Sequence, residues 1–290
     1  MSLHGNVLSK QKEKPQLTKD FFASLEPYLH RLQPPILFLH FSSFFEDSVA
    51  VKRIRSSTEA QNLFQLWNHC PRGHCVYPIY ASDSVLAMSA CSPFTSKIKT
   101  FRDFLNFYHT CPWPHQSLKS ILVQCIVLLR ELQNGNTHFS HNDFKADNIM
   151  LERCHSSYLY IGKFIVAAWS VKVVFIDAET VSGCFYKPSP LLSKLSRSSK
   201  ASFGLDFPFS PFTDIHLVFM EILCAMKEGL KIEGFLEFLD SDGIPTDYFQ
   251  QPYITKENRL SGIGRVALKQ SGRTLESMLK SKYLCSHLRA

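Results

Sequence analysis

Four kinds of polar side chain stand at short intervals between residues 141 and 148, in the string HNDFKADN. The imidazole, carboxylate, ammonium and amide groups belong to His141, Asp143, Lys145 and Asn148. Downstream, the apolar segment VVFID ends in Asp177. Each residue alone fits an ordinary loop, because Asp and Asn are common turn and cap residues. Together they supply a proton acceptor, a cation and oxygen ligands, the groups that catalysis by positioning and charge stabilisation requires.

The string resembles the catalytic loop of the protein kinase superfamily, H-R-D-x-K-x-x-N, followed by an apolar strand. The strand that ends in Asp177 is similar to the one that carries the metal-binding Asp of the D-F-G motif. The resemblance implies that Asp143 accepts the proton of the attacking hydroxyl and that Lys145 reaches the γ-phosphate of ATP. It also implies that Asn148 and Asp177 hold Mg²⁺, a hard cation that keeps several waters and needs few protein ligands.

An earlier segment resembles the nucleotide-binding strand of the same family. The string VAVK, which ends in Lys52, is similar to the V-A-I-K strand, whose Lys contacts the α- and β-phosphates and pairs with a helix Glu. Glu59 is the only glutamate between residues 46 and 131, so it is the candidate partner. It follows Lys52 by only seven positions, closer than the family usually places the pair, which leaves their contact an open question.

Two further segments extend the resemblance. VLAMSAC at 85–91 resembles the strand that enters the kinase hinge, with Met88 as gatekeeper and with Ser89 to Cys91 offering backbone groups to adenine. The segment FTDI, which contains Asp214, is similar to the start of the large C-lobe helix. The family's Asp there accepts hydrogen bonds from the catalytic-loop backbone, and a buried Asp needs such partners.

The main departure from the family is the absence of a glycine-rich loop over the phosphates. Such loops rely on missing Cβ atoms to bring backbone amides close to the phosphates, and this chain has no glycine between Gly5 and Gly73. Nucleotide binding must then rest on Lys52, the metal site and the adenine pocket. This departure keeps open the alternative of a pseudokinase that acts as a protein-binding module.

Other departures concern regulation. Ala178 stands where the family has the Phe of D-F-G, so a Phe-flip switch is not expected. Asn142 replaces the Arg that clamps an activation-loop phosphate, so any activity should be constitutive. There is no A-P-E motif after Asp177; the basic, serine-rich segment 193–200 is either a substrate-binding or autophosphorylated loop or a solvated one.

Composition limits the classes of protein that need to be considered. The chain has 290 residues and a formal net charge of +7, spread along its length and too mild to indicate nucleic-acid binding. Nine scattered cysteines predict reduced thiols in an intracellular protein, cytoplasmic or nuclear. No signal peptide is expected at the polar N-terminus. The apolar run 158–176 is interrupted by Lys163 and Lys172, so we expect two buried strands there and no membrane span.

The elements that position these residues follow from periodicity. Short antiparallel strands are expected within 34–54 and 76–91, the second pair around a turn at Asp83-Ser84. Helical spacing predicts a helix over 57–69, with Ala60, Leu63, Phe64 and Trp67 on its apolar face and Ser57 or Thr58 as cap. Apolar residues from 118 to 132 predict a long buried helix that ends at Gly135, and further helices are expected at 214–227, 229–239 and 275–284.

The predicted fold class is therefore α+β. The resemblance implies a two-lobed protein-kinase-like fold, with a flexible basic lead-in at 1–33, a reduced β-rich N-lobe with one helix at 34–91, and a larger, mainly helical C-lobe at 92–290. The compressed N-lobe resembles divergent kinases of large DNA viruses, which would place the protein in a host cell. A competing signal is the string HCPRGHC at 69–75, whose four potential zinc ligands have a spacing at the edge of structural zinc sites.

The functional expectation is an ATP-dependent, Mg²⁺-requiring serine/threonine protein kinase acting on a protein substrate. Lys145, two residues after Asp143, favours this type over tyrosine kinases and small-molecule kinases, which lack a Lys there. No membrane partner is expected. The pseudokinase remains the alternative.

Overall fold

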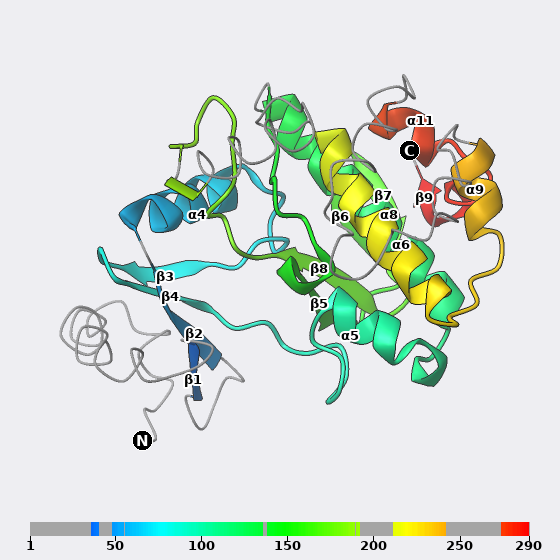
Figure 1. Cartoon of the computed structure of the whole chain (residues 1–290), viewed down its shortest axis with the longest axis horizontal. Coiled ribbons are helices and arrows are strands. Elements are labelled where there is room, and N and C mark those ends of the chain that lie inside the picture. The colour runs from blue at the N-terminus through cyan, green and yellow to red at the C-terminus, as the bar shows by residue number, and fades with distance from the viewer. Residues whose placement is uncertain are drawn as a thin grey trace.

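A computed structural model of the chain describes residues 36–40, 48–54, 56–135, 138–188, 190–191, 211–241 and 274–289. The described chain is a mixed α+β protein with small antiparallel sheets and several helices, as the sequence predicts at this level (Figure 1). The predicted lead-in at 1–33 and the segment 193–200 lie outside the described residues. No helix in the described ranges is both long and apolar enough to cross a membrane.

The first sheet has four strands: β1 (Ile36–His40), β2 (Ser48–Arg53), β3 (Pro78–Ala81) and β4 (Val85–Ser89). Their order is β1-β2-β4-β3, and every neighbouring pair is antiparallel. The predicted turn at Asp83-Ser84 is confirmed, because Ser82 closes it with backbone and side-chain hydrogen bonds to Val85. The central strands β2 and β4 are each buried over three consecutive residues, Val49–Val51 and Val85–Ala87, so both of their faces are covered.

The helix that follows β2, α4 (Ser57–His69), has the predicted bounds. The predicted cap is wrong: the cap position is Ser56, and its side chain makes no capping hydrogen bond. The predicted apolar face is wrong in part, because Phe64 and Trp67 remain 40% and 38% exposed. The buried face is instead centred on Ala60, Leu63 and Leu66, since the helix is rotated so that Trp67 meets the ring of Tyr77 edge-on at the surface.

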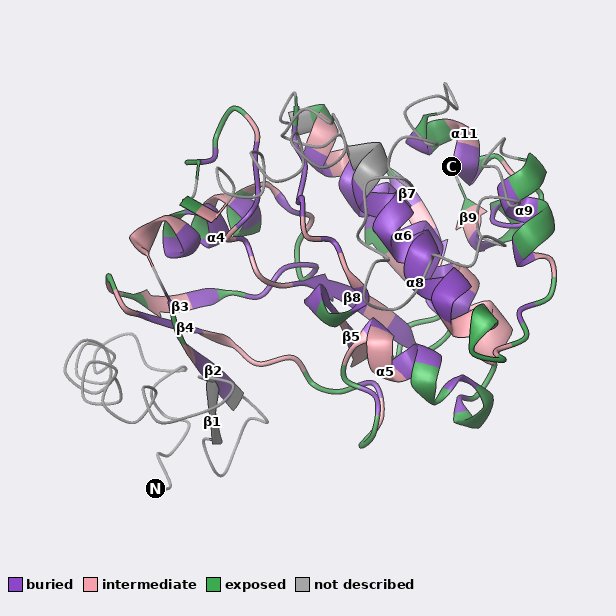
Figure 2. Ribbon diagram, viewed as in Figure 1, coloured by how far each residue is buried: buried purple, intermediate pink, exposed green. Residues whose placement is uncertain are grey.

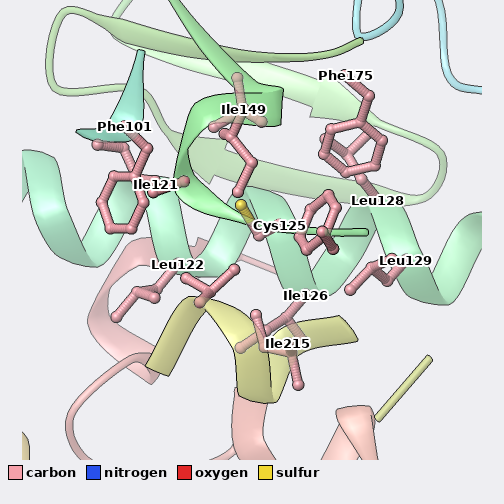
Figure 3. Close-up of a cluster of buried hydrophobic side chains, with 14 of the residues drawn as sticks. Phe101, Ile121, Leu122, Cys125, Ile126, Leu128, Leu129, Ile149, Phe175 and Ile215 are labelled. Atoms are coloured by element: carbon pink, nitrogen blue, oxygen red, sulfur yellow. The ribbon is translucent and has the colours of Figure 1, made fainter. Parts of the chain in front are cut away.

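The larger part of the molecule is built on α6 (Pro114–Gly135) and α8 (Pro211–Lys227), which lie side by side with α5 (Phe101–Asn106) near them (Figures 1 and 2). The predicted stripe on α6 is buried as expected, and Val123, Ile126 and Val127 are buried as well. The helix is enclosed on several sides because strands cover one side and α8 covers another. Figure 3 shows this core, with α6 side chains between those of Phe101, Ile149, Phe175 and Ile215.

The prediction of two buried strands within 158–176 is wrong. The segment forms three: β6 (Tyr158–Ile161), β7 (Phe164–Ala167) and β8 (Val171–Phe175). The reversals occur at Gly162 (φ 57°) and at Trp169-Ser170 (φ 46° and 64°), and the second of these has no glycine to mark it. Strand β6 lies at the surface, where Tyr160 is 77% exposed.

Two small sheets result from this arrangement. Strand β8 pairs with β5 (Ile149–Arg153), and β7 lies between β6 and β9 (Leu288–Arg289), so the end of the chain joins a sheet edge. The helices expected at 229–239 and 275–284 are shorter, α9 (Phe235–Ser241) and α11 (Leu275–Leu279). Gly229 and Gly234, at φ 107° and 72°, place the residues before α9 in turns. All nine cysteines are free thiols, as expected.

Candidate functional site

The segment that carries Asp143 is fixed by a carboxylate buried beneath it. Asp214, in the first turn of α8, accepts hydrogen bonds from the backbone N–H groups of His141 and Asn142 at 2.7 and 2.8 Å, and from the hydroxyl of Ser140 at 3.0 Å. These are the hydrogen bonds expected of Asp214 from the sequence. Because the carboxylate is fully buried, three donors and one charge hold the loop in place with little competition from water.

Asn142 has a structural role that the sequence did not reveal. Its backbone is left-handed (φ 64°), and its amide nitrogen donates to the carbonyls of Ser140 and Thr180 and to the hydroxyl of Ser182, at 2.8 to 3.1 Å. Asn142 therefore ties the loop to residues 180–182, which follow Asp177 in the chain. The available signal was the residue type, because Asn adopts positive φ more readily than most other side chains.

Asp143, Lys145 and Asn148 converge in the structure. Lys145 Nζ lies 2.7 Å from Asp143 Oδ2, and Asn148 Nδ2 donates to the same oxygen at 2.9 Å and to the Asp143 carbonyl at 2.8 Å. The turn η3 (Ala146–Asn148) brings Asn148 back toward the loop. Both hydrogen bonds to the carboxylate use Oδ2, so Oδ1 is the atom placed to accept a proton from another molecule. The Asp143 side chain is 26% exposed, which allows such access.

Lys52, Glu59 and Asp177 also converge, which answers the question left open by their spacing. Lys52 Nζ lies 2.6 Å from Glu59 Oε1 and 3.5 Å from Asp177 Oδ1. The contact across only seven positions arises because the connection from β2 to α4 is short and Glu59 lies in the first turn of the helix. Asp177 has a left-handed backbone (φ 62°), a strained conformation that often occurs at functional sites.

This triad holds more negative than positive charge. Burial opposes the ammonium of Lys52, yet the carboxylates of Asp177 and Glu59 outweigh it and raise its pKa. Burial raises the pKa of Glu59 to about 7, and Asp177 and Glu179 add to this effect while Lys52 opposes it. Lys52 is therefore charged at neutral pH, whereas Glu59 is close to its titration midpoint. A cation bound beside Asp177 would relieve the excess negative charge.

The two clusters are joined at the ends of β5 and β8. Ile149 and Phe175 are paired across these strands, and the N–H of Ile176 donates to the carbonyl of Asn148 at 3.3 Å. Asn148 and Asp177 thus project from adjacent strand ends. His141 links the same regions, since its Nε2 lies 3.1 Å from the Ile176 carbonyl, and burial lowers its pKa and keeps it neutral.

The amide oxygen of Asn148 and the carboxylate of Asp177 are ligand types that could hold a magnesium ion. The amide nitrogen of Asn148 is engaged by Asp143, so the amide oxygen is the atom that can act as ligand, and a carboxylate with an amide oxygen is typical of Mg²⁺ sites that retain water. Among the described residues, no group of three or more His, Cys, Asp or Glu side chains is arranged to hold a metal ion. The string 69–75, considered for zinc, lies within these residues and forms no such group. There, His74 Nδ1 is bonded to the Val173 carbonyl at 2.7 Å.

The residues predicted to contact adenine lie on β4 and directly after it. Met88 and Ser89 lie on β4, and the side chains of Met88 and Cys91 pack against the hydrophobic core. The backbone N–H of Ser89 donates to the Tyr77 carbonyl at 2.8 Å, so among the backbone groups of residues 89–91 this one is already engaged within the sheet. Burial, with Glu152 close by, raises the pKa of Cys91 to about 12 and keeps it a thiol. The connection between β1 and β2, where the family has its glycine-rich loop, lies outside the described residues.

Comparison with known proteins adds no relative to this picture: no model of a protein family matches the chain, and no curated protein matches it significantly.

Proposed function

We propose that the chain is an ATP-dependent serine/threonine protein kinase of a divergent type, with a two-lobed kinase-like fold and no glycine-rich loop. One observation carries the proposal. Lys52 contacts Glu59 and Asp177 at once, from three segments of the chain. Such a triad links a candidate phosphate-binding ammonium to a candidate metal ligand.

The proposed chemistry assigns a task to each cluster. Asp143 Oδ1 accepts the proton of a substrate hydroxyl, while Lys145, held at 2.7 Å from Asp143, stabilises the negative charge of the transferring phosphate. Lys52 binds the phosphates nearer the nucleoside. Asn148 and Asp177 would hold Mg²⁺, which supplies neutralisation of phosphate charge when bound. Asp214 positions the loop and touches no reactant.

A second candidate, a pseudokinase that binds a partner, is favoured by one feature. The chain has no glycine between Gly5 and Gly73, so backbone amides of a glycine-rich loop are not available to hold the phosphates. Against it, a module that only binds a partner has no need for six polar groups in two clusters, Lys52, Glu59 and Asp177 in one and Asp143, Lys145 and Asn148 in the other. Their close contacts, from 2.6 to 3.5 Å, favour the enzyme.

The test is transfer of labelled phosphate from Mg-ATP by the full-length chain, with casein and a basic protein as generic acceptors. Asp143→Asn keeps the size and hydrogen bonds of the side chain but removes the proton acceptor, and Lys52→Met keeps its length but removes the charge. Asp83→Asn and Lys97→Met make the same chemical changes at exposed positions away from both clusters. We expect transfer in the wild type and in both controls, and a loss of at least about a hundredfold in the two site variants.

Transfer that is absent, or equal in all five proteins, would end the kinase proposal. A measurement of nucleotide binding then distinguishes a pseudokinase from a protein that binds no nucleotide. If Mg-ATP raises the thermal midpoint of the wild type but not of Asp177→Asn, and no phosphate is transferred, the chain is a nucleotide-binding pseudokinase.

A further inference from the structure

A cavity of about 510 Å³ lies at the opposite end of the β5–β8 pair from the candidate site. Asn148 and Asp177 adjoin the Ile149–Phe175 end of this pair, whereas the cavity adjoins the end at Arg153 and Val171. Its size is typical of sites that hold small organic ligands. Nothing in the proposed phosphate transfer uses it.

Separate parts of the chain build this cavity. They are Trp113 before α6, the segment 154–158, Ala167 with the Trp169-Ser170 turn, and Ser286, His287 and Arg289. Helix α6 holds the turn, because the hydroxyl of Ser117 on that helix donates to the Trp169 carbonyl at 3.3 Å. One wall of the cavity, the Trp169-Ser170 turn, is therefore tied to the buried helix α6.

The backbone around the cavity is strained. Trp113, Trp169 and Ser170 all have left-handed φ values, of 55°, 46° and 64°. This conformation is unfavourable for a bulky residue, and a turn like 169–170 normally uses Asn-Gly. Half of the six non-glycine residues with positive φ in the described ranges lie around this one cavity. Retained strain of this kind is typical of binding sites.

The lining has a definite chemistry. Trp113 is 63% exposed and Trp169 is 38% exposed, with ring centroids 6.2 Å apart, so aromatic surface faces the solvent at the cavity edge. The guanidinium of Arg289 lies 4.7 Å from the ring centroid of Tyr158, also at the lining. The other lining residues are serines, two histidines, Cys154 and Ala167, and no Asp or Glu is among the described residues that line it.

The guanidinium of Arg289, with no carboxylate among the lining residues, favours anions over cations, and the aromatic side chains favour ligands that carry a ring. Ring faces stack on planar groups, and the guanidinium fork binds phosphate or carboxylate through two hydrogen bonds. We infer that this cavity is a binding site for a small aromatic anion, a planar ring bearing a phosphate or a carboxylate. The free ligand could be a nucleotide or an aryl phosphate, which share this chemistry.

The alternative explanation is that the tryptophans only pack against each other and against His287, whose ring centroid is 6.0 Å from that of Trp169. The variant Trp113→Gly distinguishes a packing role of the tryptophans from a role in ligand binding. Glycine adopts positive φ without penalty, and the side chain lost is largely exposed, so the variant should be at least as thermally stable as the wild type. If the strain is kept for binding, the same variant binds aromatic anions more weakly.

Tryptophan fluorescence gives a direct readout, because the chain has only three tryptophans and two of them line the cavity. In full-length Trp67→Phe protein, the emission comes from Trp113 and Trp169 alone. We would titrate this protein with phenyl phosphate and with AMP, and with phenol and inorganic phosphate as half-ligands. Arg289→Gln removes the cation at the cavity, and Lys97→Gln removes an exposed one elsewhere as a matched control.

We expect saturable emission changes with phenyl phosphate or AMP, and Kd values at least about tenfold higher for the half-ligands and for Arg289→Gln. The tighter of the two probes identifies the source of the anion. AMP titration of Lys52→Met should give the unchanged Kd, which keeps this site distinct from the proposed ATP site. If neither probe gives a saturable change, or if Arg289→Gln and the Lys97→Gln control bind equally, the inference is wrong. Should Arg289→Gln not fold, Trp113→Gly decides the matter in the same titration.

Discussion

The carboxylate of Asp214 accepts a 2.7 Å hydrogen bond from the backbone N–H of His141, which precedes it by 73 residues in the chain. The contact fixes the distance between the start of α8 and the loop that carries Asp143. It is a contact to backbone, so it constrains the path of the loop whatever side chains the loop bears. The arrangement of Asp143, Lys145 and Asn148 therefore depends on a residue whose carboxylate binds the preceding residues 140–142.

Asp214→Ala should lower the free energy of unfolding by about 3–5 kcal/mol, because it leaves two buried backbone N–H groups and the Ser140 hydroxyl without their charged acceptor. Urea unfolding of both proteins measures this difference. Asp83→Ala, at an exposed turn, is the control and should change stability by less than about 0.5 kcal/mol. Equal losses in the two variants would show that the Asp214 hydrogen bonds do not hold the loop.

Glu59 should make stability depend on pH in a defined window. Its pKa is about 7 in the folded chain against an ordinary value of 4.5, so between these pH values the folded state binds more protons than the unfolded state. The free energy of unfolding contributed by this group therefore falls as pH rises from about 4.5 to 7 and stays low above it. Glu59→Gln cannot titrate and should be more stable than wild type at pH 8 by about 2–3 kcal/mol, but not at pH 4.5.

Chemical unfolding of wild type and Glu59→Gln across this pH range tests the sign. Glu131→Gln, which makes the same chemical change on α6, is the matched control. If the free energy of unfolding of wild type and of Glu59→Gln changed in the same way with pH, the raised pKa of the buried Glu59 would be contradicted. In the proposed function the variant should also lose activity, because it removes the carboxylate that orients Lys52.

The sequence predicted elements where one periodic signal dominated. The bounds of α4 were correct because Ser57–His69 has helical spacing between two strand-like segments. The rotation of α4 about its own axis was harder to predict from the sequence, since Phe64 and Trp67 are apolar but lie on the surface. The turn at Trp169-Ser170 could not be predicted, because no local preference favours a left-handed tryptophan; it forms because α6 and β8 fix the chain on either side.

The candidate site was predictable as a set of residues and less so as a set of contacts. Positions 143, 145, 148 and 177 follow from spacing and a family resemblance. The Lys52–Glu59 contact depends instead on how tightly the chain turns between β2 and α4, and the engagement of the Ser89 N–H depends on pairing with Tyr77. Both are tertiary facts that residue spacing does not contain.

Asn142→Asp tests the anchor between the loop and residues 180–182. The substitution preserves shape and tolerance of positive φ but replaces an N–H donor with an oxygen that faces the carbonyls of Ser140 and Thr180. Because the site is buried, we expect a loss of about 3 kcal/mol or more in unfolding free energy. Asn106→Asp, at an exposed position on α5, should cost less than about 1 kcal/mol. If both variants lost a similar free energy of unfolding, Asn142 would not be the anchor of the loop.

Arg102 joins three elements through its guanidinium. It forms a bidentate pair with Glu221 on α8, one hydrogen bond of which is 2.7 Å long, and lies 3.3 Å from Asp147 in η3. The Glu221 side chain is only 2% exposed, whereas that of Asp147 is 49% exposed. Water therefore screens the second contact, and the pair with Glu221 dominates the energy.

Arg102→Met should cost about 3–5 kcal/mol of unfolding free energy, because it leaves the buried Glu221 carboxylate without its guanidinium partner. The double variant Arg102→Met/Glu221→Met removes both charges and should lie within about 1–2 kcal/mol of wild type, since apolar side chains fit a buried position without desolvation cost. Glu276→Gln breaks an exposed pair with Arg130 and should change stability by less than about 1 kcal/mol. Urea unfolding of the wild type, of both single methionine variants and of the double variant gives the coupling free energy between Arg102 and Glu221. Additive losses in the double variant would mean that Arg102 and Glu221 contribute independently, and that α5 and α8 are not held together by their ion pair.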